Sequence, residues 1–347
     1  MSFFYLFDVH WICARGLSVA VGTLATVASM AAPSFGGTVT SFGTGANQFQ
    51  MEFVTIGSPG NVADTTGAPN SAGRVNYTYD IGKFEVSRAM VTAYNAHTGV
   101  VAITLADMTS AGGNGANRPA TGITWNEAAR FVNWLNTSTG GFAAYNYAAD
   151  STITTNLIPW TASDTLDYDA SNPYRSKRAK YFLPSYNEWY KAAYYNPSNS
   201  TYYDFANGSN IRPTAVTGGL SGAVYTQSGE AAPTSPADVT NAGGLSPYGV
   251  MGLEGNVMEW EESSVDLLNS LGSSNRGRRG GSWSFTSTSL SSSTRSNNNP
   301  NLDQHLNGFR VASLSSVAPA AVPEPSMMLI GTVIGLGGLI AKRRMKK

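Results

Sequence analysis

The chain has 347 residues and equal numbers of basic and acidic residues, so its net charge at pH 7 is zero. A chain without a basic surplus is not typical of nucleic-acid-binding proteins, and we expect no nucleic-acid partner. Charged residues make up only 13% of the sequence, whereas Gly, Ser, Thr, Asn and Tyr are plentiful. This composition is typical of loop-rich extracellular bacterial proteins rather than of helical cytosolic enzymes.

The first residues resemble a secretory signal. Arg15 precedes an apolar, small-residue run over residues 17–32, and Ser29-Met30-Ala31 provides a small-x-small cleavage site. We therefore expect residues 1–31 to be a signal peptide and the protein to be exported through the inner membrane. The only cysteine, Cys13, lies in this segment, so the mature protein is expected to have no thiol and no disulfide.

The last residues form a three-part tail over residues 319–347. Pro323-Glu324-Pro325 is followed by an uncharged apolar run, residues 327–341, and a basic end. The tail resembles the PEP-CTERM sorting signal of Gram-negative bacteria, which implies transient membrane insertion, processing by an exosortase-type enzyme, and delivery to the cell surface or extracellular matrix. The alternative is a plain membrane anchor, although the apolar run is shorter than the ~20 residues that span a bilayer comfortably.

The first elements of the body, which we place at residues 32–318, are two strand regions and a helix. Apolar residues alternate over 50–56 and again over 75–86, each a strand pattern. Ser87 then stands where a helix N-cap is expected, and the spacing that follows predicts a helix over residues 88–97.

Two capping boxes predict two further helices. Thr124 precedes Glu127 by three residues, ahead of apolar residues at helical spacing, which predicts a helix over residues 125–136. Ser185 and Glu188 repeat the pattern and predict a second short amphipathic helix.

Two long loops separate these elements. Residues 142–180 are rich in Tyr, Asp, Ser and Thr and end in a small basic cluster, and residues 196–247 are dominated by turn signals. Clusters of this kind usually form a solvated face. The cluster consists of Arg175, Lys177, Arg178 and Lys180. Because disulfides are absent, such loops must be held by backbone hydrogen bonds or by a bound ion such as calcium.

Residues 249–260 combine glycines, apolar residues and a carboxylate. Gly252 and Gly255 can adopt positive φ, so carbonyl oxygens could converge and Glu259 could complete an oxygen cage for calcium. The alternative is a tight turn into a strand, in which Val257 and Trp260 enter the core and Glu259 is only hydrogen-bonded.

Six short motifs, in order, resemble the formylglycine-generating enzyme, or sulfatase-modifying factor, family. They are GKFEVS at 82–87, PATGITW at 119–125, LPSYNEW at 183–189, GNVMEW at 255–260, RGGSW at 279–283 and GFRV at 308–311. The resemblance covers roughly residues 52–312. It implies an α+β fold related to C-type lectin domains, with little regular secondary structure and long ordered loops.

The resemblance also implies a calcium site. The family binds calcium through backbone carbonyls and the glutamate of the Gly-Asn-x-x-Glu-Trp motif, which here makes Gly255, Val257 and Glu259 the candidate ligands. The family also places an asparagine ligand three residues before that glycine. This chain has Gly252 at that position, so we expect a weaker site.

The catalytic part of the family motif is altered. Active members carry two cysteines shortly after the Arg-Gly-Gly-Ser-Trp motif, and these hold copper(I). By spacing, Phe285 and Leu290 occupy the two positions here. Neither an aromatic ring nor an alkyl chain can replace a thiolate as a copper(I) ligand, so we expect no copper and no catalytic residues of this type.

Two other site types can be considered. A related branch of the family binds nonheme iron through three histidines, but the body here has only His97 and His305, and a facial triad would need Asp303 as its third ligand. The acidic cluster Glu259, Glu261 and Glu262 could in principle supply a carboxylate pair for sugar hydrolysis, but adjacent acidic side chains on a strand are mostly solvated.

We expect Arg279 and Arg310 to make structural pairs with carboxylates. The sequence thus favours an exported, surface-sorted member of the family that lacks the copper cysteines and acts as a non-catalytic binding or structural module, with a glycan or peptide ligand. The alternative is a metal-dependent oxidoreductase that uses nonheme iron or copper.

Overall fold

The computed structural model describes residues 37–149, 152 and 155–315. The expected signal peptide at residues 1–31 and the expected sorting tail at residues 319–347 lie outside the described residues. Within the described part of the chain, no helix is both long enough and apolar enough to span a bilayer.

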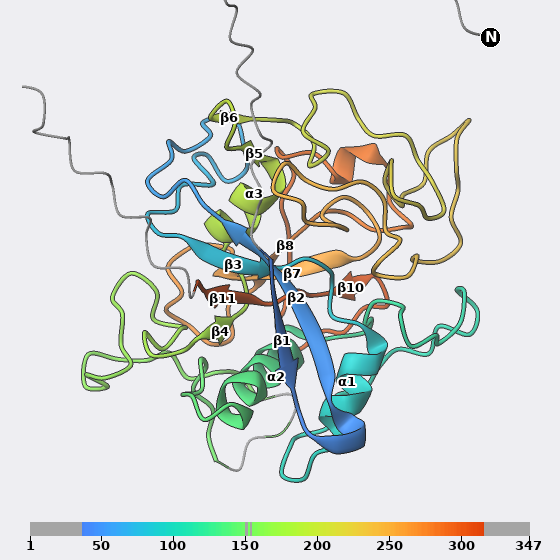
Figure 1. The fold of residues 1–347 in the computed structure, drawn as a ribbon. Coiled ribbons are helices and arrows are strands. Elements are labelled where there is room, and N and C mark those ends of the chain that lie inside the picture. The colour runs from blue at the N-terminus through green and yellow to red at the C-terminus, as the bar shows by residue number, and fades with distance from the viewer. Residues whose placement is uncertain (1–36, 150–151, 153–154, 316–347) are drawn as a thin grey trace, which may run out of the picture. The chain divides into compact units, whose positions relative to one another are not determined.

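The main sheet has five strands in the order β1-β2-β3-β11-β4, and every neighbouring pair is antiparallel. The N-terminal hairpin supplies its two longest strands (Figure 1). Their bounds are β1 Gly37–Phe42, β2 Phe49–Ile56, β3 Tyr79–Gly82, β11 Ala312–Leu314 and β4 Tyr181–Phe182, with the 3-10 turn η1 at Gly45–Asn47. The predicted first strand is thus confirmed as β2, whereas the second predicted strand region contains only the four residues of β3.

A second sheet carries the predicted functional stretch. Its order is β10-β7-β8-β9, with β10 parallel to β7 and the other pairs antiparallel. The bounds are β7 Met258–Ser264, β8 Arg276–Arg279, β9 Ser296–Asn298 and β10 Asn307–Gly308, and a small two-stranded sheet pairs β5 Tyr195–Asn196 with β6 Thr201–Tyr202. A second 3-10 turn, η2, spans Ser287–Ser289.

The three predicted helices are all present. Helix α1 spans Arg88–Asn95, and Ser87 caps it by accepting the Met90 N–H. Both capping boxes are formed, at Thr124–Glu127 ahead of α2 (Trp125–Ser138) and at Ser185–Glu188 ahead of α3 (Tyr186–Tyr194). In Figure 1, α1 and α2 lie on one side of the strands and α3 on the other.

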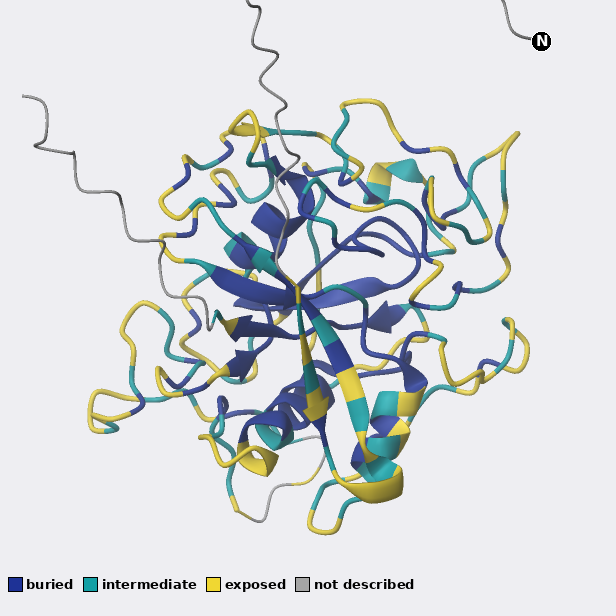
Figure 2. Cartoon of the chain, in the orientation of Figure 1, coloured by how far each residue is buried: buried dark blue, intermediate teal, exposed yellow. Residues whose placement is uncertain are grey.

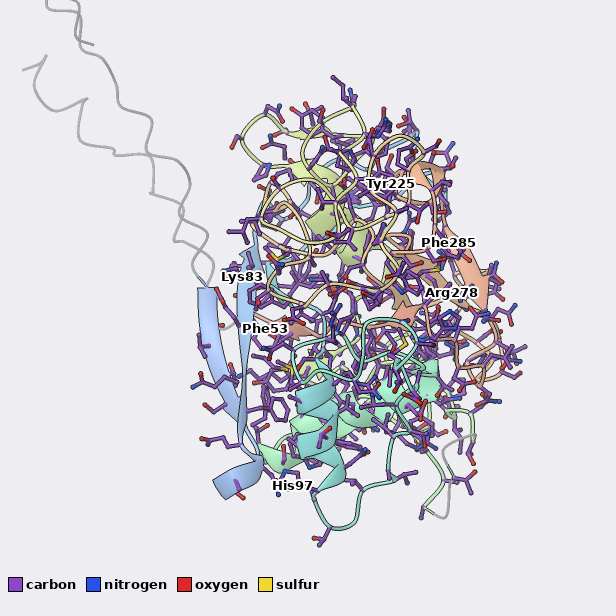
Figure 3. All side chains as sticks on the ribbon, turned by 90° about the vertical axis from the view of Figure 1, so that its right-hand side faces the viewer. Phe53, Lys83, His97, Tyr225, Arg278 and Phe285 are labelled. Carbon is purple, nitrogen blue, oxygen red and sulfur yellow. The ribbon has the colours of Figure 1, made fainter. Side chains whose placement is uncertain are left out.

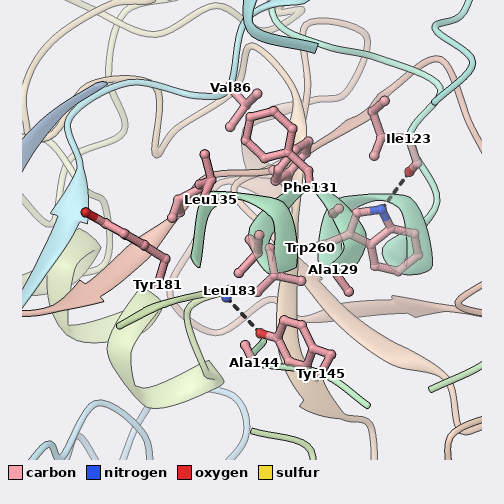
Figure 4. Packing of buried hydrophobic residues seen from close by; sticks show 14 of the residues in the cluster. Val86, Ile123, Ala129, Phe131, Leu135, Ala144, Tyr145, Tyr181, Leu183 and Trp260 are labelled. Carbon is pink, nitrogen blue, oxygen red and sulfur yellow. Dashed lines mark hydrogen bonds between the residues drawn. The ribbon is translucent and has the colours of Figure 1, made fainter. Parts of the chain in front are cut away.

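The core consists of two large apolar clusters. One packs α1 and α2 against β2 and β7, with Trp260 and Phe131 at its centre; the Trp260 indole donates to the Ile123 carbonyl at 2.8 Å (Figure 4). The other surrounds α3, where Trp189 is fully buried. The inner strands are buried, while exposed residues lie on the outer loops, the N-terminal hairpin and the outer side of α1 (Figure 2). The fold is therefore α+β with long ordered loops, as predicted.

Candidate functional site

The glycine-rich stretch forms a curled loop that runs into β7. Gly249, Gly252 and Gly255 all have positive φ, and Asn256 adopts the left-handed conformation at φ 55°. A Cβ at Gly255 would lie 2.2 Å from the carbonyl oxygen of Val224. This position therefore requires glycine for two reasons, the sign of φ and the close approach of a neighbouring backbone.

Glu259, the candidate calcium ligand, is paired with an arginine. Its carboxylate is fully buried; Arg310 donates from Nη2 to Oε1 at 2.5 Å and from Nε to Oε2 at 2.6 Å, and the Trp189 indole adds a bond to Oε2 at 2.7 Å. This is the bidentate geometry for which a guanidinium is suited. The predicted pairing of Arg310 with a carboxylate is confirmed.

This arrangement bears directly on the calcium prediction. Both oxygens of Glu259 already accept hydrogen bonds, two of them from a cation, so an ion bound by Gly255, Val257 and Glu259 would have to share this carboxylate with Arg310. As arranged, the glutamate fits a calcium ion poorly. Calcium binding by these three residues stays a prediction, and the pairing strengthens the expectation that the site is weak.

A second carboxylate, not singled out by the sequence, occupies the concave side of the loop. Glu85 is 1% exposed, and it accepts hydrogen bonds from the Asn256 amide at 2.6 Å and the Val257 N–H at 3.3 Å. A Cβ at Gly252 would lie 3.1 Å from its carboxyl carbon. Burial, and then the nearby charge of Glu259, raise the pKa of Glu85 to about 8. Glu85 thus fills the space beside Gly252 where the family has a side chain.

A third carboxylate, Glu254, is also buried beside the loop, and no arginine or lysine among the described residues pairs with it. Glu254 is 6% exposed, and the one hydrogen bond found for its carboxylate among the described residues comes from the Asn207 N–H at 2.9 Å. Burial raises the pKa of Glu254 to about 8.

The remaining acidic residues of β7 are also buried, and the expectation that they are mostly solvated was wrong. Glu261 binds two arginines: Arg279 Nε at 2.6 Å and Arg295 Nε at 2.8 Å. This confirms the predicted structural pairing of Arg279. The three acidic side chains of β7 can be buried together because at least one guanidinium group pairs with each carboxylate.

Glu262 pairs with Arg175, one of the four basic residues that were expected to form a solvated face. Arg175 lies between Glu262 and Glu188, at 2.6 and 2.8 Å, and its side chain is only 11% exposed. Tyr145 and Asn172 also donate to Glu262. For Arg175, the predicted solvated cluster is therefore wrong, because its two partners come from α3 and β7, far from it in sequence. Lys177, Arg178 and Lys180 are exposed.

The two positions that carry cysteines in active family members form no polar site. Leu290 is fully buried against Tyr225 and Ala223, and its carbonyl accepts a hydrogen bond from the Tyr194 hydroxyl. Phe285 is half-buried and pairs through its backbone with Thr226. Figure 3 shows Phe285 near the surface of this face. Neither side chain offers an atom that binds a transition metal.

The structure does not bring the candidate iron ligands together. The His97 ring packs against Trp134 just after the end of α1, tilted by 36° with ring centroids 4.7 Å apart, whereas His305 lies near Trp283. In Figure 3, His97 lies at the lower end of the molecule. Among residues 37–149, 152 and 155–315, no three His, Cys, Asp or Glu side chains gather in metal-binding geometry. Asp303 therefore does not complete a triad.

The structure also contains a polar groove that the sequence did not indicate. Two adjoining hollows, of about 510 and 340 Å³, share four lining residues. These are Arg74, Asn76, Tyr186 and Asn187. No spacing pattern marks them, because two come from a turn-rich loop and two from the first turn of α3; the hydroxyl- and amide-rich composition of the loops was the only available signal.

The family model described as sulfatase-modifying factor enzyme 1-like domain matches residues 40–314. Comparison with curated protein sequences gives no match.

Several solved structures share the fold. Treponema denticola variable protein 1 superposes with a TM-score of 0.52 at 19% identity, covering 80% of this chain and 99% of that chain. The structure of CarF gives 0.51 at 19% identity, covering 76% and 98%. PvdO from Pseudomonas aeruginosa gives 0.49 at 19% identity, covering 80% and 98%. At these identities the first two likenesses show a shared fold and nothing about ligands.

Proposed function

Because this chain belongs to the sulfatase-modifying factor enzyme 1-like family, as its six motifs predicted, we propose that it retains the family scaffold without the copper-dependent oxidation. In this proposal the protein is a non-catalytic binding or structural module of the cell envelope or extracellular matrix, with a glycan or peptide as its ligand.

The observation that carries the proposal is which residues occupy the two positions that hold cysteines in active family members. Leu290 is fully buried in an apolar cluster, and Phe285 lies five residues before it at the other end of the η2 turn. The only cysteine of the chain is Cys13, in the expected signal peptide. Copper(I) needs soft sulfur ligands, and the body of this chain provides no thiolate.

Export and surface sorting belong to the same proposal. They are supported by the apolar run at residues 17–32 with its small-x-small site, and by Pro323-Glu324-Pro325 with the apolar and basic segments that follow. Mass spectrometry of the protein recovered from cells should find a new N-terminus near residue 32 and a C-terminus near Pro323-Glu324-Pro325. An uncleaved chain in the cytosolic fraction would contradict this part of the proposal.

The loss of oxidase activity can be tested directly. We expect no oxygen consumption when the purified protein is incubated with copper and cysteine-containing peptides, while an active family member consumes oxygen under the same conditions. Turnover above the metal-only control would refute the proposal. Metal analysis of protein purified without added metal is the companion measurement, because stoichiometric iron or copper would favour an oxidoreductase.

A further inference from the structure

We propose that the groove at Arg74 and Tyr186 binds an acidic polysaccharide, with the carboxylate of one uronic acid residue on the Arg74 guanidinium and the next sugar in the adjoining hollow. This inference rests on the proposed function as a binding module and assigns it a surface and a ligand class.

The size of the groove suits short stretches of a sugar chain. The larger hollow, about 510 Å³, and its neighbour, about 340 Å³, fall in the range of small-molecule binding pockets. Because they share four lining residues, a linear ligand can pass from one to the other. Both are bounded by residues 74–77 on one side and the start of α3 on the other.

The larger hollow carries a single positive charge and no negative charge among its described lining residues. Among the described residues, Arg74 is the only charged one in its lining, which otherwise consists of small, aliphatic, hydroxyl, amide and aromatic residues. The guanidinium is exposed, and within the described part of the chain its one hydrogen bond runs from Nε to Asn76 Oδ1, at 3.3 Å. Its terminal nitrogens therefore remain available for a carboxylate, which a guanidinium can bind in bidentate geometry.

Two residues beside Arg74, Asn187 and Tyr186, have polar groups that can form hydrogen bonds with a ligand in fixed directions. Asn187 uses its Oδ1 to accept the Gly73 N–H at 2.7 Å, which leaves its amide nitrogen for a ligand. The Tyr186 hydroxyl makes no hydrogen bond with any described residue, while the backbone N–H of Tyr186 is held by Ser263. Oriented amide and hydroxyl groups around an aromatic ring are suited to sugar hydroxyls, which need several directional partners.

The second hollow has polar walls whose side chains are already held in place. Arg175 is held between Glu188 and Glu262, and Tyr77 donates to Glu188 at 2.6 Å. Asn172 is tied to Glu262 at 2.5 Å. Because these side chains are fixed before the ligand arrives, little ordering is required when the next sugar binds.

The lining of the second hollow also includes the exposed side chains of Lys177 and Asp169. The hollow therefore carries charge of both signs beside its amide and hydroxyl groups, and the ammonium group of Lys177 can lie near the carboxylate of the next uronic acid residue.

One wall of the second hollow holds its backbone in an uncommon conformation. Leu267 and Asn269, both in the lining, have φ of 63° and 53°. Left-handed backbone is unfavourable for a branched residue such as leucine and concentrates at binding sites. Asn269 is held in place by hydrogen bonds to Asn172 and Ser264.

A polysaccharide fits these features better than an acidic peptide does. The lining provides few apolar surfaces for peptide side chains; Val62, Val75 and Leu267 are its larger aliphatic members. Peptide recognition usually relies on apolar pockets or on a free strand edge. Amides, hydroxyls and a few basic side chains instead match a chain of hydroxylated rings carrying carboxylates.

The test is calorimetric titration of the purified full-length protein with tetragalacturonate and with its fully methyl-esterified form, which keeps the sugar and removes the charge. We expect the acid to bind at least about tenfold more tightly than the ester. Arg74→Gln should reduce the affinity for the acid by at least about fivefold and leave the affinity for the ester unaffected. Lys180→Gln removes one exposed charge outside the groove and should change neither affinity.

Tyr186→Phe is the second variant, and it should weaken acid and ester equally, by about threefold, because it removes one hydroxyl from the groove. Arg74→Gln and Tyr186→Phe should both unfold close to the wild-type temperature, since the Tyr186 hydroxyl makes no hydrogen bond within the described structure and the guanidinium of Arg74 makes one, an exposed bond to Asn76 at 3.3 Å. The inference is overturned if tetragalacturonate does not bind, if Arg74→Gln and Lys180→Gln have the same effect, or if tetraglutamate binds as tightly as the sugar.

These outcomes are separate from failure of the proposed function. A glycan array run on the same protein distinguishes them. Binding of other glycans with no response to galacturonate sinks the inference and leaves the binding module intact. Copper-dependent turnover sinks the proposed function, whatever binds in the groove.

Discussion

Two sets of buried carboxylates lie around the same loop and strand, and they are held in different ways. Glu259, Glu261 and Glu262 on β7 each accept hydrogen bonds from at least one arginine. Among the described residues, Glu85 and Glu254, beside the glycine-rich loop, accept hydrogen bonds only from amide groups, and burial raises the pKa of both to about 8.

The two sets of carboxylates should therefore respond differently to mutation, to pH and to added cations. A paired carboxylate contributes to the rigidity of β7, but removing its partner leaves an uncompensated buried charge. A buried carboxylate without a cation is instead sensitive to pH and to added cations. Three experiments test this contrast.

The largest effect is expected from breaking the best-buried pair. Arg310→Ala should lower the free energy of unfolding by about 3–5 kcal/mol, because Glu259 would remain buried without its partner. The control is Arg212→Ala, which breaks a more exposed pair: the side chains of Arg212 and Glu230 are 39% and 26% exposed. This control should lower the free energy of unfolding by less than about 1 kcal/mol. Urea unfolding measures both. Equal losses would show that the β7 pairs are not special.

The next effect concerns pH. Because the folded-state pKa of Glu254 is raised above its unfolded value, the folded protein holds a proton that the unfolded chain releases, so stability falls as pH rises from about 4.5 to about 8. Glu254→Gln should remove part of this decline and stabilise the protein at pH 8 by at least about 1 kcal/mol, with little change at pH 4. Thermal unfolding across this range is the measurement. A variant that is less stable than wild type at pH 8 would contradict the expectation.

The smallest effect is expected from calcium. If Gly255, Val257 and Glu259 hold an ion that is shared with Arg310, binding should be weak, with a Kd of roughly 10⁻⁴–10⁻³ M. Calcium at a concentration equal to this Kd would stabilise the fold by about 0.4 kcal/mol. A thermal shift produced by calcium, but not by equimolar magnesium, and reversed by a chelator would support the site. No shift at all would assign the loop to the tight-turn alternative.

Local signals predicted the helices, because capping boxes and helical spacing act within a few residues. The short strands β8 to β11 were not predicted, since two to four residues carry no readable alternation and form only when distant partners meet. The same reason explains the burial of Arg175: its partners Glu188 and Glu262 lie 13 and 87 positions away.

Some features of the candidate site could be predicted from the sequence and others could not. Arg279 and Arg310 each lie within a family motif, and this was enough to predict that they pair with carboxylates. The chain distance between Glu85 and Gly252, and between Arg74 and Asn187, left no pattern from which the carboxylate in the loop or the polar groove could be inferred.

The position of β11 in the main sheet has a consequence for how the protein folds. Ala312–Leu314 lies between β3 and β4 and is the last described strand, while β1 and β2 are the first. The sheet therefore cannot close until nearly the whole body has left the ribosome or any membrane channel through which the chain passes. Contacts between such distant segments slow folding. The central sheet is thus expected to assemble late, with the three capped helices forming ahead of it.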